Sequence, residues 1–205
     1  IRLNGRAIIS GNTIIAESYG ISAYGSMNLV VDGNTFERNN FGLQISLASA
    51  TEQLSVTGNN IRNTSVPLFL YVGNSEANVV IERNIFEDNS GSAVIRLLKT
   101  SRGNSTISIE RNSFMDNTGT NIESDADVKS ISYNNFMSSD NQFDIYYTGE
   151  SNVTCEGNYW LGSGIQSWIQ DRVYSVNSTG TTLVTFIRLV SDFEAIPVVA
   201  WDATW

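Results

Sequence analysis

The phrase IERNIFEDN at residues 81–89 recurs with few changes as IERNSFMDN at residues 109–117. A reduced form occurs along most of the chain: an apolar residue, two spacers, an asparagine, a spacer and a second apolar residue. The asparagines of this pattern are Asn12, Asn34, Asn59, Asn84, Asn112, Asn134 and Asn158, at steps of 22, 25, 25, 28, 22 and 24 residues. A repeat of this size predicts a solenoid in which each unit buries its apolar face against its neighbours.

Apolar residues at alternate positions precede each of these asparagines. The position three residues before is Ile, Val or Cys, and the position five before is Ala, Leu, Val or Ile except at Lys129. Alternation with a period of two predicts a strand with one buried face. A further apolar run in several units, such as FGLQISL at 41–47, predicts another short strand. We therefore predict an all-β fold, a right-handed parallel β-helix of about seven coils.

The repeated asparagines have a structural explanation. Each coil has to turn sharply between its strands, and asparagine adopts the left-handed backbone conformation more readily than most residues. If the turns stack, the side-chain amides donate to and accept from one another along a ladder. We expect the seven asparagines to form such a structural ladder, and the alternative is a row that binds a ligand. A second asparagine often follows the first, at Asn39, Asn63, Asn89 and Asn117.

The pattern changes after residue 160. Apolar residues at steps of three and four between Ile165 and Val176 predict a short amphipathic helix at 165–176, and TTLVTFIRLV predicts a strand at 181–190. We divide the chain accordingly into coils at 1–160 and a C-terminal cap with a tail at 161–205. A cap is expected because the last coil of a solenoid otherwise exposes unpaired backbone groups.

The net charge and the hydropathy of the chain limit the classes of partner that it is expected to bind. The formal net charge of −9, with arginines scattered along the chain, argues against binding to nucleic acid. No apolar run reaches the length of a membrane-spanning helix, and the first residues resemble neither a signal peptide nor a protein start. We expect a piece of a longer protein that does not itself insert into a membrane. Its expected partners are other proteins or further domains of the same chain, with a glycan as an additional candidate.

Four triplets match the N-glycosylation acceptor, at Asn63, Asn104, Asn152 and Asn177. Each falls in a predicted turn or loop, where an oligosaccharide would be accommodated at the surface. Together they predict an extracellular or cell-surface glycoprotein. The single cysteine, Cys155, has no partner in the chain and takes an inward strand position, so we expect a buried free thiol.

The end of the repeat carries a family resemblance. NYW at 158–160 is followed, after Leu161, by Gly162, then by a predicted helix containing IQDRV at 169–173 and a predicted strand containing VTF at 184–186. This ending, on a β-helix with an asparagine ladder, resembles the β-helix units of the Bark beetle (Anakonda) proteins. The resemblance implies a module of a large animal glycoprotein of epithelial cell corners, which carries repeated extracellular modules on one membrane anchor.

Candidate catalytic residues are few. The chain has no histidine, which removes the usual general base near neutral pH and the commonest metal ligand. The best carboxylates for a glycosidase are Asp125 and Asp127, with Glu123 beside them; the same three are a weak candidate calcium site, and the alternative is a solvated acidic turn. A lyase would use Lys129 as its base. The alternative, which we favour, is that the strand shifts there and Lys129 reaches solvent.

Two acidic residues are expected to stack on the outer surface. Glu82 and Glu110 occupy equivalent positions in adjacent coils, and Arg83 and Arg111 follow them as counter-charges, which predicts a surface ion network. The residues together favour a non-catalytic extracellular scaffold or binding module that acts in cell adhesion or extracellular assembly. No cofactor is required, with calcium as the one alternative. The competing hypothesis is a polysaccharide-active enzyme, either a lyase or a glycoside hydrolase of the pectate-lyase-like β-helix type.

Overall fold

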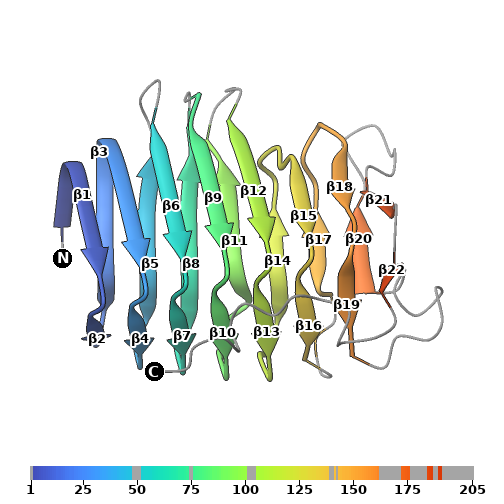
Figure 1. Ribbon diagram of the computed structural model, residues 1–205, viewed down its shortest axis with the longest axis horizontal. Helices are drawn as coiled ribbons and strands as arrows, with labels where there is room; N and C mark the ends of the chain where they lie inside the picture. The colour runs from blue at the N-terminus through green and yellow to red at the C-terminus, as the bar shows by residue number, and fades with distance from the viewer. Residues whose placement is uncertain are drawn as a thin grey trace.

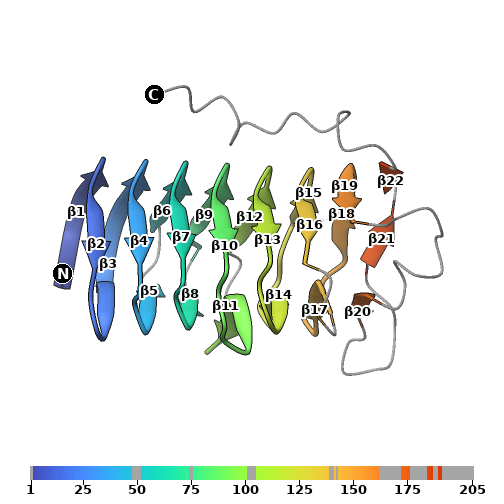
Figure 2. The same ribbon diagram turned by 90° about the horizontal axis from the view of Figure 1, so that it is seen from below.

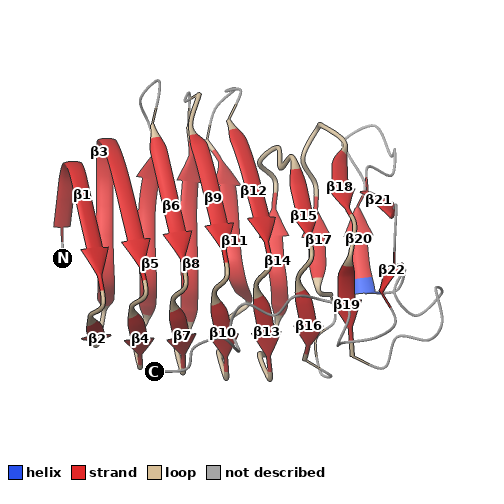
Figure 3. Ribbon diagram, in the orientation of Figure 1, coloured by secondary structure: helices blue, strands red, loops and turns tan. Residues whose placement is uncertain are grey.

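The computed structural model describes residues 2–47, 52–73, 76–100, 105–138, 141, 143–161, 172–175, 184–186 and 189–190. Within these residues the chain winds into a solenoid whose coils succeed one another along one axis (Figure 1). Among the residues that the structure describes, the regular elements are strands, and Arg172 alone is helical (Figure 3). No helix in the described ranges has the length and hydropathy needed to cross a membrane.

The strands form three faces, each of which follows the solenoid axis. Face A comprises the C-terminal half of β3 (Tyr19–Asp32), β6 (Gln53–Thr57), β9 (Asn78–Glu82), β12 (Thr106–Glu110), β15 (Ser130–Ser132), β18 (Val153–Cys155) and β21 (Val184–Phe186). Face B comprises β2 (Thr13–Ile15), β4 (Thr35–Glu37), β7 (Asn60–Arg62), β10 (Ile85–Glu87), β13 (Ser113–Met115), β16 (Asn135–Met137), β19 (Asn158–Trp160) and β22 (Leu189–Val190). Face C comprises the N-terminal half of β3, β5 (Phe41–Leu47), β8 (Val66–Val72), β11 (Ala93–Lys99), β14 (Thr120–Ser124), β17 (Ile145–Tyr147) and β20 (Val173–Ser175). Figure 2 brings face B to the front.

All neighbouring strands are parallel, as a solenoid of stacked coils requires. The long strand β3 passes from face C to face A without a break, so faces A and C form one continuous 14-stranded sheet, and face B is a separate sheet of 8 strands. β1 (Arg2–Ser10) pairs along β3 with a register shift between Leu3 and Gly5. The predicted all-β parallel β-helix is therefore confirmed, and six turns separate the seven ladder asparagines.

The core lies inside the solenoid and repeats from coil to coil. The inward rows before the asparagines are buried as expected, for example Val31, Val56, Ile81 and Ile109. On face B the residues two positions after the asparagines stack in one column. Its rings Phe86, Phe114, Phe136 and Trp160 have successive centroid distances of 5.1, 5.2 and 5.2 Å. Stacked rings of this spacing add to the hydrophobic stabilisation and align the coils.

The inner row is broken where the sequence indicated. Lys129 is exposed, and its neighbour Val128 is buried instead. The backbone N–H of Lys129 nevertheless donates to Ile107 O, and its carbonyl accepts from Thr154 N, so the ladder of main-chain bonds continues. The favoured interpretation, in which the chain shifts and Lys129 reaches solvent, is confirmed.

Coil stacking continues beyond residue 161. β20 pairs with β17, β21 pairs with β18 and β22 pairs with β19, all in parallel register. The predicted helix at 165–176 is therefore wrong for Val173–Ser175, which form β20, while residues 162–171 and 176 lie outside the described residues. The three strands extend the three faces because each offers its main-chain groups to the strand of the coil before. The single strand predicted at 181–190 is instead two short strands on different faces, because β21 pairs with β18 on face A and β22 pairs with β19 on face B; residues 181–183 and 187–188 lie outside the described residues.

Candidate functional site

Asparagines occupy the corner between faces A and B, here called the first corner. Asn34 shows the pattern: its Nδ2 donates to Asn59 Oδ1 at 3.0 Å and to Ile9 O at 2.9 Å, and its backbone N donates to the same Asn59 Oδ1 at 2.9 Å. Equivalent amide-to-amide bonds run from Asn12 to Asn158. From Asn34 onward the ladder residues are buried. The expected asparagine ladder is thus present, and its amides are used within the protein.

The left-handed residue of the first corner is the one before each asparagine. Positive φ angles occur at Gly11, Gly33, Gly58, Arg83, Arg111, Tyr133 and Gly157. Our expectation that the asparagine itself adopts this conformation is therefore wrong. The asparagine side chain has to point into the corner to reach the adjacent coils, whereas the preceding residue points its side chain outward and carries the reversal of the backbone.

A second ladder lies at the corner between faces B and C, the second corner. Its rungs are Asn39, Thr64, Asn89, Asn117 and Ser138. Asn63, which we had grouped with these asparagines, is instead the positive-φ residue before Thr64, in the same place as Arg38, Asp88 and Asp116. Its side chain is exposed, which removes it from the ladder.

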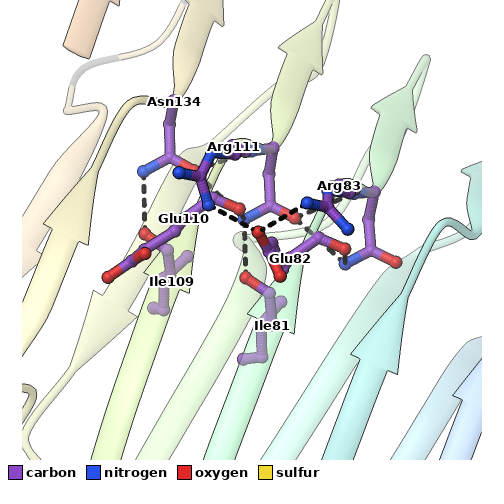
Figure 4. A network of polar contacts seen from close by, with 9 residues as sticks. Ile81, Glu82, Arg83, Ile109, Glu110, Arg111 and Asn134 are labelled. Atoms are coloured by element: carbon purple, nitrogen blue, oxygen red, sulfur yellow. Dashed lines mark hydrogen bonds and ion pairs between the residues drawn. The ribbon is translucent and has the colours of Figure 1, made fainter. Parts of the chain in front are cut away.

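The predicted outer ion network forms around Glu82 (Figure 4). Arg111 Nη1 lies 2.7 Å from Glu82 Oε1, and Arg83 Nη2 lies 3.6 Å from the same oxygen. Glu110 pairs in register with Glu82, as expected from the repeat. Arg111 also lies over the ring of Tyr133 at 5.7 Å. Both arginines therefore compensate the charge of Glu82, and such partly exposed pairs each contribute little free energy to stability.

The candidate carboxylates of residues 123–127 are held by separate partners. Asp127 Oδ2 lies 2.9 Å from Lys99 Nζ, and its Oδ1 accepts from the backbone N–H groups of Glu150 at 2.9 Å and Ser151 at 2.8 Å. Partial burial acts to raise the pKa of Asp127, but the Lys99 ammonium and the two N–H groups outweigh it and hold that pKa below its usual value. Asp127 is therefore an ionised clamp for the 150–151 turn.

The other two acids point to different partners. Asp125 Oδ1 accepts from the backbone N–H of Lys99, and Glu123 forms an ion pair with Arg96 at 3.2 Å. Within the described ranges no three His, Cys, Asp or Glu side chains gather to hold a metal ion. The three carboxylates of the weak calcium candidate therefore have separate partners: Glu123 pairs with Arg96, Asp127 pairs with Lys99 and the 150–151 turn, and Asp125 accepts from the backbone of Lys99.

A buried charged cluster that sequence reasoning missed joins three successive coils at face C. Asp144 Oδ1 accepts from Asn121 Nδ2 at 2.7 Å and from Arg172 Nη2 at 2.9 Å, and Arg172 also donates to Ser138 O. Burial raises the pKa of the Asp144 carboxyl, against the opposing charge of Arg172. The available signal was the resemblance of DIYY at 144–147 and RVYS at 172–175 to NIES at 121–124, which the helical assignment concealed.

The glycosylation candidates divide into two groups. Asn63 and Asn152 are exposed in turns, where an attached oligosaccharide would reach solvent, while Asn104 and Asn177 lie outside the described residues. Cys155 is a buried free thiol, as predicted, and burial raises its pKa to about 12. A thiol held protonated in the core is a poor nucleophile.

Two hollows lie on the outer faces. One, on face A, has a volume of ≈ 370 Å³ and is lined by residues of β1, β3, β6 and β9, which include the polar side chains of Arg6, Asn28, Gln53 and Asn78. The other, on face C, has a volume of ≈ 380 Å³ and is lined by Ser22, Ala23, Tyr24, Gln44, Ser46 and Tyr71. The polar residues that line both hollows occupy outward positions, which the repeat motif leaves free to vary.

The family model described as the right handed beta helix region matches residues 1–104. The chain belongs to the right-handed β-helix family. Neither the curated proteins nor the solved structures gave a match. The right-handed β-helix continues beyond the matched residues, since β12 and the strands after it stack in the same register.

Membership of the right-handed β-helix family does not select between enzyme and scaffold, because the fold occurs in both. The chemistry of this particular β-helix therefore has to be judged on its side chains. Among the described residues Glu123 and Asp127 form ion pairs, the thiol of Cys155 is buried, and two of the hollows on the outer faces remain open to a ligand.

Proposed function

We propose that this right-handed β-helix is a non-catalytic scaffold or binding module of a larger extracellular glycoprotein, which acts in cell adhesion or extracellular assembly. The observation that carries the proposal is the state of Asp127, the strongest catalytic candidate in the sequence. A glycosidase acid needs a raised pKa so that it retains a proton near neutral pH. The pKa of Asp127 is lowered by Lys99 and two backbone donors.

The ladders support the same function. Their amides satisfy buried backbone groups in both corners and hold the coils in fixed register, so the outer faces are rigid surfaces. A rigid surface with varied outward side chains suits recognition of a partner without reaction. The resemblance of residues 158–186 to Bark beetle proteins and the exposed Asn63 and Asn152 acceptors favour an extracellular glycoprotein.

The function is tested by a turnover screen on uronate polymers and neutral glycans, with and without calcium. We expect no product, and we expect Asp127→Asn to lower the free energy of unfolding because Lys99 and the 150–151 turn lose a charged acceptor. Glu156→Gln, at an outward position of the coil that follows, is the matched control. Turnover that Asp127→Asn abolishes without unfolding the protein would establish the enzyme hypothesis instead.

The compartment is tested separately by the intact mass of protein from its native source. We expect glycan on at least two of the four acceptors, with Asn63 and Asn152 as the first candidates because both are exposed. Release of the added mass by an amidase specific for N-linked glycans is the control. An unmodified mass at all four asparagines would contradict the extracellular assignment.

A further inference from the structure

The hollow on face C, here called the tyrosine hollow, is lined by Ser22, Ala23, Tyr24, Gln44, Ser46 and Tyr71. Its two tyrosines lie on the same outward row: Tyr24 pairs in register with Ser46, and Ser46 pairs with Tyr71. They are therefore two strands apart, a separation of about 10 Å at the usual strand spacing. The small Ser46 between them leaves the gap open.

The gap has the dimension of a single ring. A ring in van der Waals contact with an aromatic face lies about 3.5–4 Å from it, so a ring held between two aromatic faces needs about 7–8 Å. The two tyrosines are about 10 Å apart, which is more than a flat ring needs. The remaining space matches the greater thickness of a puckered, non-planar ring. A helix, about 10–12 Å across with its side chains, does not fit between them.

The side chains at the base of the hollow are polar and neutral. Ser22 and Ser46 supply hydroxyls, Gln44 supplies an amide, and all three are half-buried on face C. Hydroxyl and amide groups both donate and accept hydrogen bonds, as do the hydroxyls of a sugar. None of the six lining residues is charged, so the hollow offers no counter-ion to a uronate or a phosphate.

The rings of Tyr24 and Tyr71 differ in how firmly neighbouring side chains hold them. The ring of Tyr71 lies edge-on against Phe69, with centroids 4.6 Å apart, and Phe69 is in turn flanked by Phe41 and by the Arg96 guanidinium. Tyr71 is thus preorganised. Tyr24 is 54% exposed, an unusual amount of aromatic surface to leave in water, and its ring is free to turn onto a ligand.

We propose that the tyrosine hollow binds a neutral saccharide, with one pyranose ring held between Tyr24 and Tyr71 and its hydroxyls bonded to Ser22, Gln44 and Ser46. The inference goes beyond the proposed function and is separable from it. Glycan turnover would overturn the non-catalytic function and leave the hollow as a binding site. If no saccharide binds, the proposed binding site is refuted, and the scaffold function still stands.

The experiment titrates the intact chain, labelled with ¹³C at the tyrosine rings, with cellotetraose, maltotetraose, mannotetraose and tetragalacturonate. We expect at least one of the three neutral probes to shift the Tyr24 and Tyr71 ring signals saturably, and tetragalacturonate to leave them unmoved. Tyr24→Ala and Tyr71→Ala should each weaken binding about tenfold, whereas Tyr24→Phe should retain it, because stacking uses the ring.

Two further variants separate binding from folding. Ser46→Trp leaves both tyrosines in place and fills the gap between them, so it should abolish binding while the unfolding transition is retained. Tyr174→Ala, an exposed tyrosine at the far end of face C that stacks on Tyr146, is the matched control and should bind as the unchanged protein does. The proposal is overturned if no neutral probe moves either ring at about 10 mM. It is equally overturned if Tyr174→Ala weakens binding as much as Tyr24→Ala, or if tetragalacturonate binds the hollow in preference to the neutral probes.

Discussion

The two corners of the solenoid use the same backbone turn with different chemistry. At the first corner every rung from Asn12 to Asn158 is asparagine, and each amide donates to the next while accepting from the one before. At the second corner the rungs include Thr64 and Ser138, whose hydroxyls interrupt the chain of amides. An amide has two donor hydrogens and an acceptor and so bridges two coils at once, whereas a hydroxyl has a single hydrogen to donate.

The consequence of the interruption is visible at Asn39. Its backbone N reaches Thr64 Oγ1 at 3.4 Å, against 2.9–3.0 Å for the amide-accepted bonds of Asn34, Asn59 and Asn84. The Thr64 hydroxyl donates to its own strand, at Arg62 O, so it does not extend the ladder. Asn39 Oδ1 is buried without a hydrogen-bond partner among the described residues. The first corner is therefore the stronger restraint on coil register.

The largest expected effect comes from removal of a central rung at the first corner. Asn84→Ala removes the acceptor of Asn59 N and Nδ2 and the donor to Asn112 Oδ1 and Val56 O, which leaves several buried groups unpaired. We expect a loss of about 4 kcal/mol in the free energy of unfolding by urea, against about 2 kcal/mol for Asn89→Ala at the second corner. Equal losses would show that the corners are equivalent.

The next effect concerns the backbone reversal. Gly58 has φ +61°, and a Cβ there would meet its nearest atom, Asp32 Oδ1, at an ordinary 3.5 Å, so the cost of a side chain is conformational. We expect Gly58→Ala to destabilise by about 1–2 kcal/mol. The mirror variant is Asp88→Gly at the second corner, where φ is 53°. It should stabilise in the same urea unfolding measurement, and destabilisation by Asp88→Gly would contradict the assignment of strain to this position.

A smaller effect is expected from repair of the second ladder. Thr64→Asn would give Asn39 an amide acceptor and extend the asparagine run to Asn89 and Asn117. We expect a gain of about 1 kcal/mol in the free energy of unfolding. The reverse change, Asn89→Thr, is the control and should lose about the same amount. If Thr64→Asn destabilises instead, the hydroxyl is preferred at that rung for its packing.

The smallest effect is electrostatic and belongs to the surface of the second corner. Hydrogen bonds from Arg38 and then Arg62 lower the pKa of Glu37. A carboxyl whose pKa is lower in the folded state stabilises the protein above its unfolded pKa, and this contribution disappears as pH falls through the folded pKa. Glu37→Gln should therefore reduce stability slightly near neutral pH, and the difference from the unchanged protein should disappear as pH falls through the folded pKa of Glu37. The Glu37 carboxyl signal should titrate below about pH 4.3 by NMR, and a midpoint above that value would refute the shift.

Most of the coil could be predicted because its signals are local. Alternating apolar residues before Asn34, Asn59 and Asn84 determine which side of the strand is buried, and the asparagine marks the corner. The left-handed residue was misplaced by one position, since a preference of asparagine for that conformation was outweighed by its need to point inward. The helix at 165–176 failed at Val173–Ser175 because apolar spacing over so few residues is compatible with a strand, and pairing with β17 decides the matter.

Sequence by itself determined the asparagine ladder of the first corner, the inner rows and the burial of the Cys155 thiol, because each depends on residues a few positions apart. Only the tertiary structure decided which outward side chains meet on face C. The asparagine steps vary from 22 to 28 residues, so the alignment of Tyr24, Ser46 and Tyr71 on one row follows from strand pairing. The Asp144–Arg172 pair, 28 residues apart, has the same origin. Because the coils stack, residues about one coil apart in the sequence lie on adjacent strands. A site built from such residues therefore has no local sequence motif.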